Sequence, residues 1–163
     1  YAPDHTGGSA IHVHDCTIRT LLTLGEYTSD AVIERNRIAY LYLDHTGNVI
    51  VANNAFMQAE ANWLWGALAI EGPEDSVKVY YNTFYRPPHE VSSCWVWGYG
   101  LDFRNNVLAI LDSSAYGALR VETTYTTFAA LDYNCYWIVP PVPAVRVIVS
   151  AGVRTRSSRP IES

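Results

Sequence analysis

A short pattern of apolar residues and asparagine recurs along the chain. In one copy Val49 and Val51 precede Asn54, and Phe56 follows it two positions later. The six copies are centred on Cys16, Asn36, Asn54, Asn82, Asn106 and Asn134. Two apolar residues spaced by two point to the same face of a β-strand. The pattern therefore predicts, in every copy, one short strand before the central residue and another after it.

The central asparagine breaks the alternation and predicts a tight corner between the two strands. Among the residues other than glycine, asparagine best tolerates a left-handed backbone conformation, so we expect the Asn itself to turn the chain. The gaps between successive centres are 20, 18, 28, 24 and 28 residues. Self-similarity at a period of about 20–50 residues is typical of stacked repeats. We therefore expect the Asn side chains to lie in one file and to hydrogen-bond along the stack.

The doubled asparagines, Asn53-Asn54 and Asn105-Asn106, give the repeat a resemblance to the right-handed parallel β-helix of pectate-lyase-like proteins. The resemblance covers roughly residues 10–138. It implies an all-β fold, a right-handed single-stranded parallel β-helix (solenoid) of about six coils. We place this domain at residues 1–139. Prolines interrupt the pattern from Pro140 on, so residues 140–163 are predicted to be a Pro/Arg/Ser-rich tail, disordered or the end of a truncated chain.

A second family of strands is expected between the corners. Its members are Leu22–Leu24, Leu41–Leu43, Leu68–Ile70, Trp95–Trp97 and Leu119–Val121. Three long connections precede the last three members and would project from one edge, as walls of a groove. Trp95 and Trp97 stand at inward spacing and are predicted to lie in the core, with Cys94 in the preceding loop.

In each copy, the residue directly after the last residue of this strand is expected to point outward. Those positions hold Gly25, Asp44, Glu71, Gly98 and Glu122. Paired carboxylates are what glycoside hydrolysis requires, at separations of about 5–5.5 Å for retention and about 6.5–9.5 Å for inversion. Our hypothesis takes Glu71 as the acid and Asp44 or Glu122 as the base or nucleophile. Acidic residues also end strands simply for solubility, and that alternative stays open.

The loops supply candidate substrate contacts. Trp63 and Trp65 in the first long loop are predicted sugar platforms, because aromatic faces stack on the C–H surfaces of sugars. Further candidate contacts are Arg86, His89, Tyr99 and Arg120. His89, and His45 beside Asp44, could equally be inert surface histidines.

The composition of the chain limits the classes of partner and cofactor that we expect. The formal charge of −5 argues against nucleic acid, and no apolar run is long enough to cross a membrane. Cys16 and Cys135 belong to the first and last copies, too distant to bridge, so we predict no disulfide and infer no compartment from the cysteines. No residue set indicates a metal site, and no cofactor is expected, apart from calcium if the protein is a lyase.

The resemblance implies a polysaccharide-acting enzyme, a hydrolase or a lyase, that is secreted or at the cell surface. The chain begins at Tyr1 and shows no signal peptide, so it is expected to be a mature form or an excised piece. Hydrolysis by paired carboxylates is the favoured interpretation. The alternatives are a calcium-dependent lyase and a non-catalytic solenoid that binds glycan or serves as an adhesin or tail-fibre segment.

Overall fold

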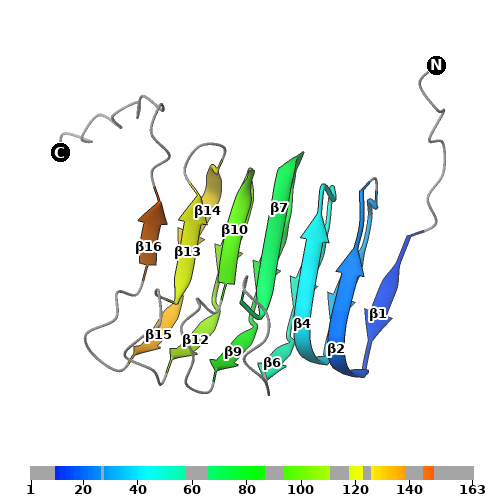
Figure 1. Ribbon diagram of the computed structural model, residues 1–163, viewed down its shortest axis with the longest axis horizontal. Coiled ribbons are helices and arrows are strands. Elements are labelled where there is room, and N and C mark those ends of the chain that lie inside the picture. Colours follow the sequence, from blue (N-terminus) through cyan, green and yellow to red (C-terminus); the bar gives the residue numbers. More distant parts are fainter. Residues whose placement is uncertain are drawn as a thin grey trace.

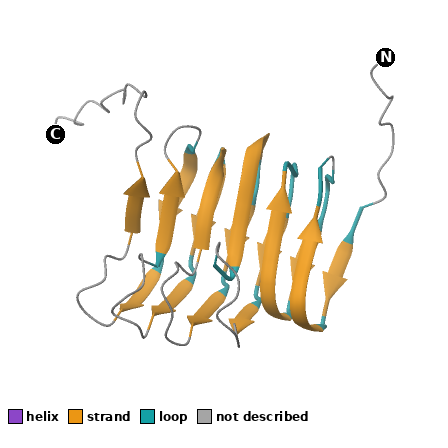
Figure 2. Ribbon diagram, in the orientation of Figure 1, coloured by secondary structure: helices purple, strands orange, loops and turns teal. Residues whose placement is uncertain are grey.

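The computed structural model describes residues 10–26, 28–57, 66–86, 94–110, 118–122, 126–138 and 145–148. Regular structure in these ranges is entirely β, with sixteen strands, no helix, and parallel pairing throughout. The strands form two sheets that lie one behind the other in Figure 1, and loops join them at the ends (Figure 2). Within the same ranges, no helix is of the length and apolarity that crossing a membrane needs.

The smaller sheet contains the strand that precedes the central residue in each of the six copies. In spatial order its strands are β1 (His12–His14), β3 (Val32–Glu34), β5 (Ile50–Ala52), β8 (Lys78–Tyr80), β11 (Leu101–Arg104) and β14 (Phe128–Asp132). The inward apolar residues align across it, since Ile33 pairs with Val13 on one side and Val51 on the other. Neighbouring copies of the sequence repeat are therefore neighbours in space, as predicted.

The larger sheet is strongly curled. Its order is β15 (Cys135–Ile138), β12 (Val107–Ile110), β9 (Thr83–Arg86), β6 (Ala55–Met57), β4 (Arg37–Asp44), β7 (Leu68–Asp75), β10 (Cys94–Tyr99), β13 (Leu119–Glu122) and β16 (Val145–Ile148), with β2 (Thr17–Leu24) beside β4. Strand β4 makes the bend, because Arg37 and Ile38 pair with β6 whereas Leu41–Asp44 pair with β7. In β2 and β4 the strand after the corner and the next predicted strand are continuous, because no long loop separates them (Figure 1).

The central asparagines form the expected ladder. Each Oδ1 accepts the backbone N–H of the central residue in the preceding copy at 2.9–3.0 Å, from Cys16 onward. Each Nδ2 donates to a backbone carbonyl of that preceding copy at 2.8–2.9 Å. Asn36, Asn54, Asn82 and Asn106 are 1–3% exposed. Repeating the same amide at every corner thus satisfies backbone groups that water does not reach.

The prediction that the Asn itself carries the left-handed turn is wrong. The residue before it does so, with φ between 54° and 56° in all six copies: Asp15, Arg35, Asn53, Tyr81, Asn105 and Tyr133. This turn points the following side chain inward, where an amide can both donate and accept. The central asparagine is therefore required for its side chain and not for its backbone.

The core lies between the two sheets and includes the stacked rings of Phe56 and Phe84, whose centroids are 4.5 Å apart. Cys94 and Val96 occupy the positions between the sheets in β10, so the prediction that Trp97 lies in the core is wrong, as is the placement of Cys94 in a loop. Trp95 is buried at 8% exposed, as predicted, but it is not part of the cluster between the sheets. All four residues of this segment are apolar, so alternation alone does not decide which pair faces inward. Burial raises the pKa of the Cys94 thiol, and all three cysteines are free.

Four residues of the predicted tail take part in the larger sheet. Val145–Ile148 form β16, which pairs in parallel with β13, Leu119 opposite Val145. Strand pairing therefore extends beyond residue 139. The other residues after 138 lie outside the described ranges.

Candidate functional site

An outward row of side chains crosses the face of the larger sheet formed by β4, β7, β10 and β13. Asp44 pairs with Glu71, and Glu71 pairs with Trp97. The pairing of Val96 with Val121 places Glu122 next in the row, one strand beyond Trp97. We call Asp44, Glu71, Trp97 and Glu122 the acidic row. Neighbouring members are about 4.8 Å apart at the backbone, and Glu71 and Glu122 are roughly 10 Å apart.

The structure brings the three predicted carboxylates into one row but corrects its fourth member. Trp97 stands where Gly98 was expected, because Cys94 and Val96 are the residues that face the core. An aromatic side chain therefore separates Glu122 from the Asp44–Glu71 pair.

Glu71 is held by a tyrosine of the neighbouring strand. The Tyr42 hydroxyl donates a hydrogen bond to Glu71 Oε2 at 2.5 Å. Tyr42 is the backbone partner of Ala69, whose small side chain leaves room for the ring to reach Glu71. Burial and this hydrogen bond raise the pKa of Tyr42, so it stays a proton donor over the ordinary pH range. The bond orients the Glu71 carboxylate.

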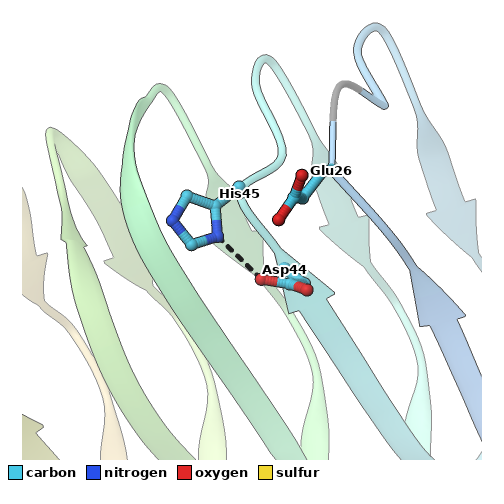
Figure 3. A group of neighbouring side chains, drawn as sticks. All are labelled: Glu26, Asp44 and His45. Carbon is cyan, nitrogen blue, oxygen red and sulfur yellow. Dashed lines mark hydrogen bonds and ion pairs between the residues drawn. The ribbon is translucent and has the colours of Figure 1, made fainter.

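Asp44 belongs to a second cluster, at the end of β4. A hydrogen bond of 2.7 Å joins Asp44 Oδ1 to His45 Nδ1, and Glu26 approaches from the preceding strand connection (Figure 3). The hydrogen bond to Asp44 raises the pKa of His45, and the nearby charges of Glu26 and Glu71 act in the same direction. The imidazole of His45 therefore holds its proton more tightly beside Asp44 than it would alone.

The backbone fixes the position of the His45 ring. His45 donates its backbone N–H to the Glu71 carbonyl at 2.7 Å. Gly72, at φ +120°, passes directly against the ring, and a Cβ there would lie 2.8 Å from His45 Cγ. A glycine is thus required for β7 to pass this imidazole.

The same three side chains could hold a cation. One ligand atom from each of Glu26, Asp44 and His45 lies within 4.8 Å of the others. Ligands at about 2.0–2.6 Å from a single ion have separations of this size; carboxylates suit calcium, and imidazole suits transition metals. Sequence analysis missed Glu26 because it lies one residue past the aligned position of Gly25. An acidic residue beside that position was the available signal.

A second outward row runs beside the acidic row. Trp95 pairs with Ala69 on one side and with Arg120 on the other. Arg120 Nε is buried and has no hydrogen-bond partner among the described residues. Tyr99 lies two residues past Trp97 and pairs with Asp75 after a register shift. Two of the predicted substrate contacts, Arg120 and Tyr99, are thus on strands that carry the acidic row or adjoin it.

The remaining predicted contacts are not placed. Trp63, Trp65 and His89 lie outside the described residues, and so does the side chain of Arg86, the last residue of β9. The predicted groove walls therefore stay a prediction.

Two hollows lie away from the acidic row. One, of about 420 Å³, is lined by Thr17, Ile18, Arg19, Arg37, Ile38, Ala39 and Met57. The other, of about 260 Å³, is lined by Tyr80, Tyr81, Arg104 and Asn105. Neither includes a residue that the sequence singled out as a candidate contact.

Comparison with known proteins found no matching family model, no matching curated protein and no matching solved structure. The function must therefore be argued from the site itself.

Proposed function

We propose that the chain is a right-handed parallel β-helix of about six coils, similar to pectate-lyase-like proteins, that acts on a polysaccharide along the acidic row. The parallel pairing of successive repeats and the asparagine ladder support the β-helix. Connections between parallel strands are right-handed in nearly all known cases, which supports the handedness. Such proteins act outside the cell, and we include a secreted or cell-surface location in the proposal.

The observation that carries this proposal is the pairing of Asp44 with Glu71 on adjacent strands. One strand spacing, about 4.8 Å, is close to the separation of about 5–5.5 Å that retaining glycosidases use. Trp97 continues the row and offers an aromatic face for the next sugar ring. Glu122 lies at roughly 10 Å from Glu71, a distance more suited to substrate contact than to the chemical step.

The hydrogen bonds assign the roles differently from the initial hypothesis. Glu71 accepts a hydrogen bond from the Tyr42 hydroxyl and so is suited to act as the nucleophile and not as the acid. In the proposed reaction a Glu71 oxygen attacks the anomeric carbon while the Asp44–His45 pair gives its proton to the departing glycosidic oxygen. A water molecule then returns a proton to that pair, and its hydroxyl displaces Glu71 from the sugar. Arg120 would bond a substrate oxygen through its Nε.

The test is a screen of plant, algal and bacterial polysaccharides for new reducing ends and for unsaturated products, with and without calcium. On an active glycan, Glu71→Gln should lower kcat by several orders of magnitude, because it removes the nucleophile that forms the covalent intermediate. Glu122→Gln is the matched control, one isosteric change on the same row, and should mainly raise KM. Unchanged turnover in Glu71→Gln would remove this residue from the mechanism.

The cluster of Glu26, Asp44 and His45 favours a second candidate, a cation-dependent lyase. Unsaturated products that appear only with calcium would select it, and Glu26→Gln would then raise the calcium concentration needed. Binding without either product would select a non-catalytic, glycan-binding solenoid.

A further inference from the structure

The exposed aromatic side chains of the described residues gather on two repeats. They are Tyr81 (61% exposed), Tyr85 (43%), Tyr133 (79%) and Trp137 (71%). Each repeat contributes one ring at its corner and another four residues later on the following strand, β9 or β15. Exposed aromatics that share one arrangement on two repeats are not scattered surface residues.

The register places the two pairs on either side of one intervening repeat. Tyr85 pairs with Ala109, and Ala109 pairs with Trp137. At the corner, Arg104 pairs with Tyr80 and with Asp132, so the residues that follow them, Tyr81, Asn105 and Tyr133, are also in register. The two pairs are therefore two strand spacings apart, about 9.6 Å.

The intervening repeat presents smaller side chains at the same heights. Asn105 and Ala109 stand opposite the rings, and the half-exposed Val107 lies between them. Two aromatic ridges thus border a floor of small residues. We call Tyr81, Tyr85, Asn105, Val107, Ala109, Tyr133 and Trp137 the aromatic trough.

The trough carries no charged side chain. Beside the corner, Arg104 is paired with Asp102, which accepts from its Nε and Nη2 at 2.6 Å, and the guanidinium lies 5.5 Å from the centre of the Tyr80 ring. Asp132, the residue before Tyr133, is exposed. Next to the Arg104–Asp102 pair, the hollow of about 260 Å³ includes Tyr81 and Asn105 in its lining. The trough therefore ends in a recess with aromatic faces, amide and hydroxyl groups, and the Arg104 guanidinium that Asp102 pairs with.

This chemistry fits one class of ligand. Pyranose rings present C–H faces that stack on aromatic side chains, and their hydroxyls bond phenol, indole and amide groups at the ring edges. An uncharged trough gives no advantage to a polyanion. The spacing of the ridges is close to the length of a disaccharide unit in an extended β-linked chain, so two equivalent sugar faces can meet two equivalent ridges.

We propose that the aromatic trough is a binding site for a neutral, extended β-linked glycan, separate from the acidic row. The trough lies on β9, β12 and β15 and their corners, whereas the acidic row lies beyond the bend of the sheet on β4, β7, β10 and β13 (Figure 1). The inference does not rest on the function proposed for the acidic row. A chain without any cleaving activity would still bind here.

The experiment is depletion of the protein by insoluble cellulose and chitin, together with affinity electrophoresis in soluble xylan and mannan. The double variant Tyr81→Ala/Trp137→Ala should bind the preferred glycan roughly tenfold more weakly. Trp137→Phe should restore most of the binding that Trp137→Ala loses, because the stacking face remains.

Met57→Ala is the matched control. Met57 is 40% exposed and pairs with Tyr85 in the same outward row, but lies outside the trough. Its loss should leave binding unchanged, and circular dichroism should show that all variants fold, since each altered side chain is exposed. Lack of wild-type binding to every neutral glycan overturns the proposal, as does undiminished binding by the double variant or an equal loss in Met57→Ala. A wild-type dimer in sedimentation that the double variant dissociates would also overturn it, since the face would then join two copies of the chain.

Discussion

On the inner face of the strands the side chains are similar from repeat to repeat, whereas on the outer face they differ. Asn54 is buried and bonded to the copies on both sides, whereas its neighbour Asn53 is exposed. Phe84 is buried against Phe56, whereas the next residue, Tyr85, is 43% exposed. Inner positions keep one chemistry from copy to copy, but outer positions change from acid to aromatic to small residue. Stability should therefore reside on the inner face and recognition on the outer one.

The largest expected effect on stability is at Phe84. Phe84→Ala should lower the free energy of unfolding by about 3–5 kcal/mol, because it removes a fully buried ring that stacks on Phe56 and Phe103 and leaves a cavity. Urea denaturation followed by circular dichroism measures the change. Tyr85→Ala on the adjacent outer position is the control and should cost less than about 1 kcal/mol. Equal losses in the two variants would contradict the division between the faces.

The asparagine ladder gives the next effect. Asn54→Ala removes the acceptor of the Asn36 N–H and the donor to the Ile33 carbonyl. Two orphaned buried groups at about 1–3 kcal/mol each predict a loss of roughly 3 kcal/mol in the same denaturation experiment.

Asn53→Gly is the control for the ladder. Asn53 is exposed and carries the positive φ, which glycine adopts without strain, so the change should cost about 0.5 kcal/mol or less. A larger loss at Asn53 than at Asn54 would mean that the corner backbone, and not the buried amide, holds the repeats together.

The same division explains how much the sequence could predict. The strands around each central residue, their stacking and the ladder all follow from inner positions, whose chemistry repeats and is therefore visible in one sequence. The segment Cys94-Trp95-Val96-Trp97 has no polar member to fix its register, so its two tryptophans were wrongly placed between the sheets, although Trp95 is buried. A one-residue error of this kind exchanges the two faces of a strand.

The candidate site was predicted in part for the same reason. Asp44, Glu71 and Glu122 follow core residues of aligned strands, so counting from the inner face finds them. Glu26, the Tyr42 hydrogen bond and the aromatic trough depend on which outer side chains face each other across strands. No repeated pattern encodes those contacts, and only the register of the folded chain reveals them.

The smallest expected effect concerns the outer face alone, at the Asp44–His45 pair. The pKa of His45 is raised above its ordinary value of about 6.5, so its contribution to stability is fully present below that pH. The contribution is lost as the pH rises through the raised pKa. The wild-type melting temperature should therefore fall more steeply between about pH 6 and pH 9 than that of His45→Gln.

This pH-dependent change in melting temperature should be small, and a second variant tests whether it depends on Asp44. The side chains of His45 and Asp44 are 37% and 31% exposed, so water and salt screen the pair. Asp44→Asn leaves the imidazole in place but removes its partner, and it should flatten the pH dependence as His45→Gln does. If the melting temperature varied with pH in the same way for the wild type and both variants, the protonated imidazole would gain no stability from Asp44 on folding. In that case the cluster could not hold the proton that the proposed cleavage requires, although the ladder and the core would be unaffected.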